Sequence, residues 1–303
     1  MRERTRKASI FLVAALVAAA VAVLPAQQAG AQEQGQEHLS QARLAVEQSS
    51  LTKEGKLGIL TKVDRAVAAG IPPEDAAVII TRGLRQNVPG KDIEGYLETA
   101  RSVKERGLPA RLVLDRIEQG LAKGVPPERI AAVAQMLFDN LAAARPMVNK
   151  IETSGVKPAG KGNGDEATET VARALEKSIP PAAIMGAADQ VRGRKGSMAL
   201  FNRAVDTMTM FAGSGMSADQ ASRMVHTALG KGCSEGDLEA MERYMADGLR
   251  KNRPMHDVVS GMESRMERGS MQGGFDRMGG GSMGGGMSSG ERGGMGGMGG
   301  RGK

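Results

Sequence analysis

The sequence predicts an all-α fold of tandem short helical hairpins, an α-solenoid-like or irregular helical array followed by a disordered Gly/Met-rich C-terminal tail. Three observations predict it. A turn phrase recurs at alternating steps of 17 and 20 residues, apolar residues recur at spacings of three and four between the turns, and no stretch shows the period of two that is typical of a strand. An alternating repeat of 37 residues is typical of stacked helix pairs.

The turn phrase consists of Gly or another helix breaker, a small apolar residue, and then Pro or Ser. Glycine ends a helix in the left-handed conformation, and the apolar residue after it packs back on the last turn. Proline suits the first turn of the next helix because its φ is fixed, while a serine hydroxyl caps a free backbone amide. The copies begin at Gly70, Asn87, Gly107, Gly124, Ser178, Gly215, Gly232 and Asn252.

The segments between the turns carry apolar stripes with helical spacing. Each stripe predicts one amphipathic helix whose apolar face joins the core. The clearest stripes are Ile93, Tyr96, Leu97, Ala100 and Val103; Val113, Ile117 and Leu121; Ile130, Val133, Leu137 and Leu141; and Leu238, Met241, Met245 and Leu249.

Residues 1–31 are predicted to be a cleaved secretory signal peptide. A basic start is followed by an apolar run, Ile10 to Leu24, that is about 15 residues long and too short for a comfortable membrane span. Ala29-Gly30-Ala31 then offers a small-x-small cleavage site. An uncleaved N-terminal anchor is the alternative. The mature protein is expected to be periplasmic or secreted, with no stable membrane span.

Two helical halves are predicted, residues 32–152 and 166–268. Residues 153–165 are rich in Gly and Lys and coincide with a slip of about three residues in the repeat, so they are interpreted as a linker or loop. Residues 269–303 are mostly Gly, Met, Ser and Arg. They bury too little apolar surface to offset backbone entropy and are expected to be disordered.

Charge and cysteine content narrow the class of protein. Of the formal net charge of +7, the first residues carry +3 and the last 35 residues carry +2, which leaves +2 on the helical body. A body this near neutrality gives no reason to expect a nucleic-acid partner. Cys233 is the only cysteine, so no intrachain disulfide forms. Packing alone must hold the fold.

Two short motifs match enzyme patterns only superficially. Gly232 to Gly236 reads G-x-S-x-G around Ser234, but a nucleophile elbow follows a strand, whereas Ser234 is predicted to cap a helix. Gly155 to Gly162 approaches a phosphate-binding loop, but Gly162 stands where Ser or Thr is needed, and no apolar strand leads in. A helix cap and a flexible linker are the preferred interpretations.

The histidines and the cysteine suggest no metal or catalytic site. His38, His226 and His256 have no metal-ligand spacing and are expected on the surface. Cys233 occupies the apolar position of its turn phrase and is expected to be buried, with a reactive thiol as the alternative. No catalytic residue and no cofactor site is predicted.

Methionine is the one compositional signal with a chemical interpretation. Of 20 methionines, 17 lie from Met185 onward. Thioethers select Cu(I), and the spacings in the tail would bring sulfur atoms together. In the helical body, methionine at stripe positions is a core filler. The candidate soft-metal ligands are Met283, Met287, Met295 and Met298.

These observations favour a non-catalytic scaffold or protein-interaction module of the bacterial envelope, with protein partners. The alternative is a periplasmic Cu(I)-binding protein that uses the Met-rich tail. An enzyme is not expected, because the sequence offers no set of acid, base and nucleophile at a spacing that chemistry requires.

Overall fold

The computed structural model describes residues 33–158 and 163–267 of the chain. The predicted signal peptide, the four candidate copper ligands and the tail from residue 269 lie outside the described residues. Within them the all-α prediction is confirmed: the chain forms an irregular array of twelve helices packed in sequential pairs. The one extended pairing there is an isolated bridge between Lys157 and Ser197.

The helices follow one another with short turns. A first helix occupies residues 33–48. The others are α2 (Lys53–Ala68), α3 (Pro73–Arg85), α4 (Gly90–Glu105), α5 (Arg111–Ala122), α6 (Pro127–Thr153), α7 (Asn163–Glu176), α8 (Pro181–Gly193), α9 (Met198–Gly213), α10 (Ala218–Gly230), α11 (Glu235–Arg250) and α12 (Met255–Glu267). None of the helices in the described ranges is both long and apolar enough to cross a lipid bilayer.

Each turn phrase ends its helix as expected. At the first copy Gly70 has φ 95°. Its N–H donates a hydrogen bond to the carbonyl of Val67, and the N–H of Ile71 donates one to the carbonyl of Ala66. This pair of bonds is the Schellman motif, which satisfies carbonyls that the helix end leaves free. All eight predicted copies begin at a residue with positive φ.

The structure contains a further copy of the turn phrase, which begins at Lys195 and was not predicted from the sequence. Lys195 has φ 55°, Gly196 N–H bonds Val191 O, and Ser197 caps α9 by accepting a hydrogen bond from Leu200 N–H. Lysine is an unusual residue for a positive φ, and glycine takes the apolar place, so the phrase was not recognisable by composition. This copy restores the steps of 17 and 20 between Ser178 and Gly215.

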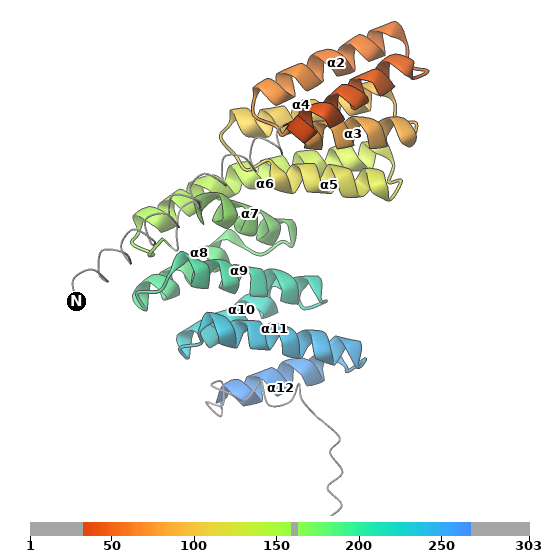
Figure 1. Ribbon diagram of the computed structural model, residues 1–303. Helices are drawn as coiled ribbons and strands as arrows, with labels where there is room; N and C mark the ends of the chain where they lie inside the picture. The colour runs from red at the N-terminus through yellow and green to blue at the C-terminus, as the bar shows by residue number, and fades with distance from the viewer. Residues whose placement is uncertain (1–32, 159–162, 268–303) are drawn as a thin grey trace, which may run out of the picture.

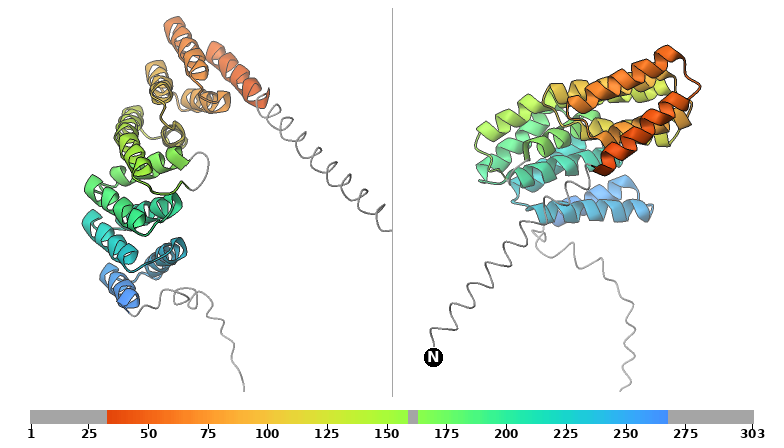
Figure 2. Two further views of the ribbon diagram at one scale, coloured as in Figure 1. Left: turned by 90° about the vertical axis from the view of Figure 1, so that its left-hand side faces the viewer. Right: turned by 45° about the horizontal axis from the view of Figure 1, so that its top comes forward.

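The two steps correspond to two helix lengths. Steps of 20 contain the 16-residue helices α4, α9 and α11, and steps of 17 contain helices of 12 or 13 residues. Most helices two apart in the chain lie side by side, so that even-numbered and odd-numbered helices form two layers. Figure 1 shows the stack from α2 to α12, and the left view of Figure 2 shows both layers end on, bent toward the odd-numbered one.

The long helix α6 changes which of the two layers contains the longer helices. It runs for 27 residues through Pro146, where the repeat would place a turn. Residues between the turns at Gly124 and Ser178 therefore form two helices where the repeat would form three. The longer helices consequently lie in the even-numbered layer before α6 and in the odd-numbered layer after it.

One hydrophobic core runs through the whole stack. It includes Leu39 of the first helix and Met266 of α12, and its largest fully buried side chains are Tyr96, Phe201 and Phe211. Residues on both sides of the predicted linker join it, and α6 packs extensively on α7. Leu249, expected in the core from its stripe, is instead 37% exposed, and it is the second-last residue of α11.

Candidate functional site

Ser234 is the N-cap of α11. Its hydroxyl oxygen accepts a hydrogen bond from Asp237 N–H at 3.3 Å, and Asp237 Oδ2 accepts from the Ser234 N–H at 2.8 Å and from its hydroxyl at 2.7 Å. These contacts form a reciprocal capping box. A glycine turn with φ 91° at Gly232 precedes it rather than a strand. The helix-cap interpretation is therefore the one that fits the local structure.

Cys233 is buried, with 3% of its surface exposed. Its N–H bonds Ala228 O in the turn, as the apolar member of the phrase does in the other copies. Burial, with the nearby Asp237 carboxylate, raises the pKa of the thiol to about 11. A thiol with this pKa is almost entirely protonated at neutral pH, which argues against a nucleophilic role.

The three histidines lie on three different helices. His38 is exposed on the first helix, His226 Nε2 lies 2.9 Å from Ala183 O, and His256 is exposed beside Asp257 on α12. Among the residues that the structure describes, no three His, Cys, Asp or Glu side chains gather as metal ligands. The structure thus does not bring the three histidines together with one another into a common site.

The segment that resembles a phosphate-binding loop is only partly described. Gly155 has φ 100° in the turn after α6, and Lys157 accepts a hydrogen bond from Met198 N–H at 2.7 Å. Residues 159–162 lie outside the described ranges. The described part is tied to the start of α9 by its backbone.

A ladder of ion pairs runs along the odd-numbered layer. An arginine on each of α3, α5, α7 and α9 forms an ion pair with an acidic residue on the next odd-numbered helix. The pairs are Arg82 with Glu118 at 2.9 Å, Arg116 with Glu176 at 3.1 Å, Arg173 with Asp206 at 3.2 Å, and Arg203 with Glu242 at 3.4 Å. Partly exposed pairs contribute about 0–1 kcal/mol each. They join each odd-numbered helix from α3 to α9 to the next odd-numbered helix.

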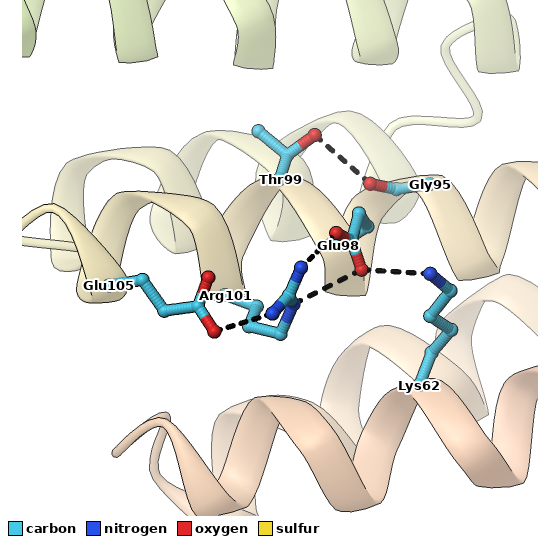
Figure 3. Close-up of polar contacts among 6 residues, drawn as sticks. All are labelled: Lys62, Gly95, Glu98, Thr99, Arg101 and Glu105. Carbon is cyan, nitrogen blue, oxygen red and sulfur yellow. Dashed lines mark hydrogen bonds and ion pairs between the residues drawn. The ribbon is translucent and has the colours of Figure 1, made fainter.

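The even-numbered layer has one comparable contact near the N-terminal end. Glu98 of α4 accepts hydrogen bonds from Arg101 of the same helix and from Lys62 Nζ of α2 at 2.9 Å (Figure 3). These donors, Arg101 first, lower the pKa of Glu98 to about 2. Its charge therefore holds α2 against α4 and is not available as an acid near neutral pH.

A groove lies between α10 and α12. The backbones of α10 and α12 approach each other less closely than those of α8 and α10 do, and a hollow of about 350 Å³ lies between them. It is at the blue end of the stack in Figure 1. Six residues on one stripe of α10 and its preceding turn, and four on one stripe of α12, line it: Met216, Gln220, Arg223, Met224, Thr227, Lys231, Val259, Glu263, Met266 and Glu267.

The groove has a charged rim above three buried methionines. Met216, Met224 and Met266 lie beneath it and are at most 5% exposed. Arg223 and Lys231 are exposed on the α10 side, and Glu263 and Glu267 on the α12 side. These four rim charges make no ion pair with any residue in the described ranges. A second hollow, of about 390 Å³ between the first helix and the α3–α4 turn, is lined by no charged residue.

No protein-family model, curated protein or solved structure matches this chain. The candidate site therefore rests on the geometry of the chain itself. No sequence pattern marks the groove residues as a site. Met224 and Val259 are ordinary stripe residues in sequence, and only the distance between α10 and α12 places them beside a common hollow.

Proposed function

We propose that this protein is an exported, non-catalytic scaffold or protein-interaction module of the bacterial envelope. The observation that carries the proposal is the continuous core through a bent stack of helices, because such stacks offer extended surfaces to protein partners. Export follows from the predicted signal peptide. Recognition would depend on shape and apolar contact more than on net charge, since the helical body carries only +2 of the formal net charge.

The local chemistry of the polar residues supports the same proposal. Ser234 takes part in a helix cap, the Cys233 thiol is buried with a raised pKa, and Glu98 bridges two helices. Each of these groups has a structural partner that accounts for its position. A partner protein bound along the stack would contact several helices at once.

The test is affinity capture of the mature chain from its own envelope fraction, followed by cross-linking of the recovered complex. We expect a reproducible protein partner, with cross-links on helices from both sides of residues 153–165. His226, Cys233, Ser234 and His256 are then each replaced by Ala. Loss of partner binding in one such variant, at an unchanged unfolding midpoint, would point to a discrete chemical site and contradict the scaffold assignment.

The Cu(I) alternative is tested on the same purified protein. Its specific basis is the clustering of methionine in the tail. Copper that is recovered with the parent chain and lost when Met283, Met287, Met295 and Met298 are replaced together by Leu would favour it. Equal copper content in the two proteins would remove it.

A further inference from the structure

We infer that α12 is a movable element of the stack, which closes on α10 until the acidic side of the groove meets the basic side and Glu267 forms an ion pair with Lys231. The structure shows the open arrangement, in which the groove keeps these two charges apart. The inference concerns two conformations of the chain itself, so it is independent of whether the stack binds a partner protein.

The register of α10 and α12 suits this ion pair. Two pairs that join neighbouring helices of one layer elsewhere in the stack link residues 36 positions apart, one less than the repeat of 37. These pairs are Lys62 with Glu98 and Arg82 with Glu118, each at 2.9 Å. Lys231 and Glu267 are also 36 positions apart, and both line the groove. The distance between the two helices, and not their register, therefore keeps this pair open.

The packing of α12 leaves room for movement. Whereas α10 packs on both α8 and α9, α12 packs closely on α11 alone among the described helices. Its first residue, Met255, lies near the turn before α10, where the Met255 Cε atom is 3.8 Å from the place that a Cβ would take at Gly215. The helix is thus in contact with the α10 side at its beginning, while Glu267 at its other end lies across the groove from Lys231.

The contacts between α11 and α12 form a line about which α12 can turn. Val258 of α12 sits over Gly248 of α11, and the Tyr244 hydroxyl of α11 sits over Gly261 of α12. At each of these points a side chain packs on a glycine, so the ridges of the two helices interlock little there. Arg265 stacks on the Tyr244 ring at 4.5 Å, and its long side chain can follow a small rotation.

Neither arrangement has a large energetic advantage. Exposed ion pairs contribute little to stability, so the pair formed on closing cannot lock α12 in place. The three methionines beneath the rim are at most 5% exposed in the open arrangement, so closing buries little more apolar surface. Both conformations are therefore populated, and a modest perturbation shifts the balance between them.

This balance makes the C-terminal end of the described stack adjustable. The closed form continues the side-by-side packing of the even-numbered layer, and the open form presents four rim charges to the surroundings. A partner that pairs with Glu263 and Glu267 would hold α12 open. Higher salt would do the same, because it screens the attraction across the groove.

Distances between two spin labels, measured by double electron–electron resonance on the full mature chain, test the movement. The labels are attached at Ala182→Cys on α8 and Ser260→Cys on α12, both exposed positions, with Cys233→Ala to remove the native thiol. Because α10 lies between α8 and α12 in the layer, closing shortens this distance. We expect two populations, and NaCl at about 1 M, where charges are screened beyond about 3 Å, should lower the shorter one several-fold.

Charge variants of the labelled chain give the second arm of the test. Glu263→Gln with Glu267→Gln should lower the shorter population several-fold. The same change at Glu33 and Glu47, exposed on the first helix, is the matched control and should leave it unchanged. Thr227→Lys should raise it several-fold, because this position precedes Glu263 by the 36 residues that separate the pairs already formed. The urea unfolding midpoint of each variant is measured so that a change in fold is recognised.

Two results would overturn the inference. One is a single label distance that salt, the Gln variants and Thr227→Lys all leave unchanged. The other is a coupling between Lys231 and Glu267 in a double-mutant cycle of unfolding midpoints without any change in label distance. The two side chains would then bridge an immobile groove, and α12 would not move.

Discussion

Ser234→Ala distinguishes a helix cap from a catalytic residue. The substitution removes the hydroxyl that accepts from Asp237 N–H at 3.3 Å and donates to Asp237 Oδ2 at 2.7 Å. The Asp237 carboxylate keeps its 2.8 Å bond from the backbone N–H of residue 234, so one half of the capping box remains. We therefore expect the loss of one cap, about 1 kcal/mol of unfolding free energy.

Urea unfolding followed by circular dichroism measures this loss. With a denaturant slope of about 1–3 kcal/mol per M, 1 kcal/mol lowers the midpoint by about 0.3–1 M. Ser217→Ala should lower it by a similar amount, because Ser217 and Gln220 form the equivalent box at α10. Ser260→Ala is the matched control, since Ser260 is an exposed position within α12 that caps no helix, and it should change stability by less than about 0.5 kcal/mol.

Two results would refute the reasoning. An unchanged midpoint for Ser234→Ala would show that the hydroxyl does not cap α11. An unchanged midpoint together with the loss of a measured hydrolase activity would restore the nucleophile interpretation of the G-x-S-x-G motif.

Three further predictions concern α6, Glu98 and Cys233. Pro146→Ala should raise the unfolding free energy by about 1–3 kcal/mol, because Pro146 is exposed inside a helix and removes a backbone hydrogen bond; a lower urea midpoint would contradict this. Glu98→Gln should cost about 1 kcal/mol at neutral pH after allowance for solvent screening. Since the folded pKa is lowered, the stabilisation is present above the ordinary value of 4.5 and should vanish as pH falls toward about 2, which unfolding across that range measures. The Cys233 thiol should react with a thiol reagent at mildly alkaline pH only after urea unfolding, and rapid native labelling would exclude its burial.

The helix ends were predictable because their chemistry is local. Gly70, Gly107 and Gly124 stand where a positive φ is needed, and Ser217 stands where a side chain must cap an amide. Interactions of this kind join residues within about one turn, so a single sequence contains them in full. Lys195 shows the limit, because tertiary packing holds a lysine in a conformation that its own preference disfavours.

The candidate site was not predictable in the same way. Met224 and Met266 are separated by 42 positions in sequence, and both fit the pattern of core residues. Whether they pack against each other or line a hollow depends on how far α12 lies from α10. In sequence, the rim charges of Glu263 and Arg223 resemble any solvated helix face.

The sequence by itself determined the all-α class, nearly every helix boundary and the alternation of helix lengths, because these depend on caps, breakers and the 3.6-residue period. Only the tertiary structure decided that α6 continues through Pro146, that the longer helices change layers there, and that one core joins the two halves. It also decided which acidic residues form ion pairs with the arginines of the odd-numbered layer. These features depend on contacts between residues tens of positions apart, whose free energies are set by packing and not by any local pattern.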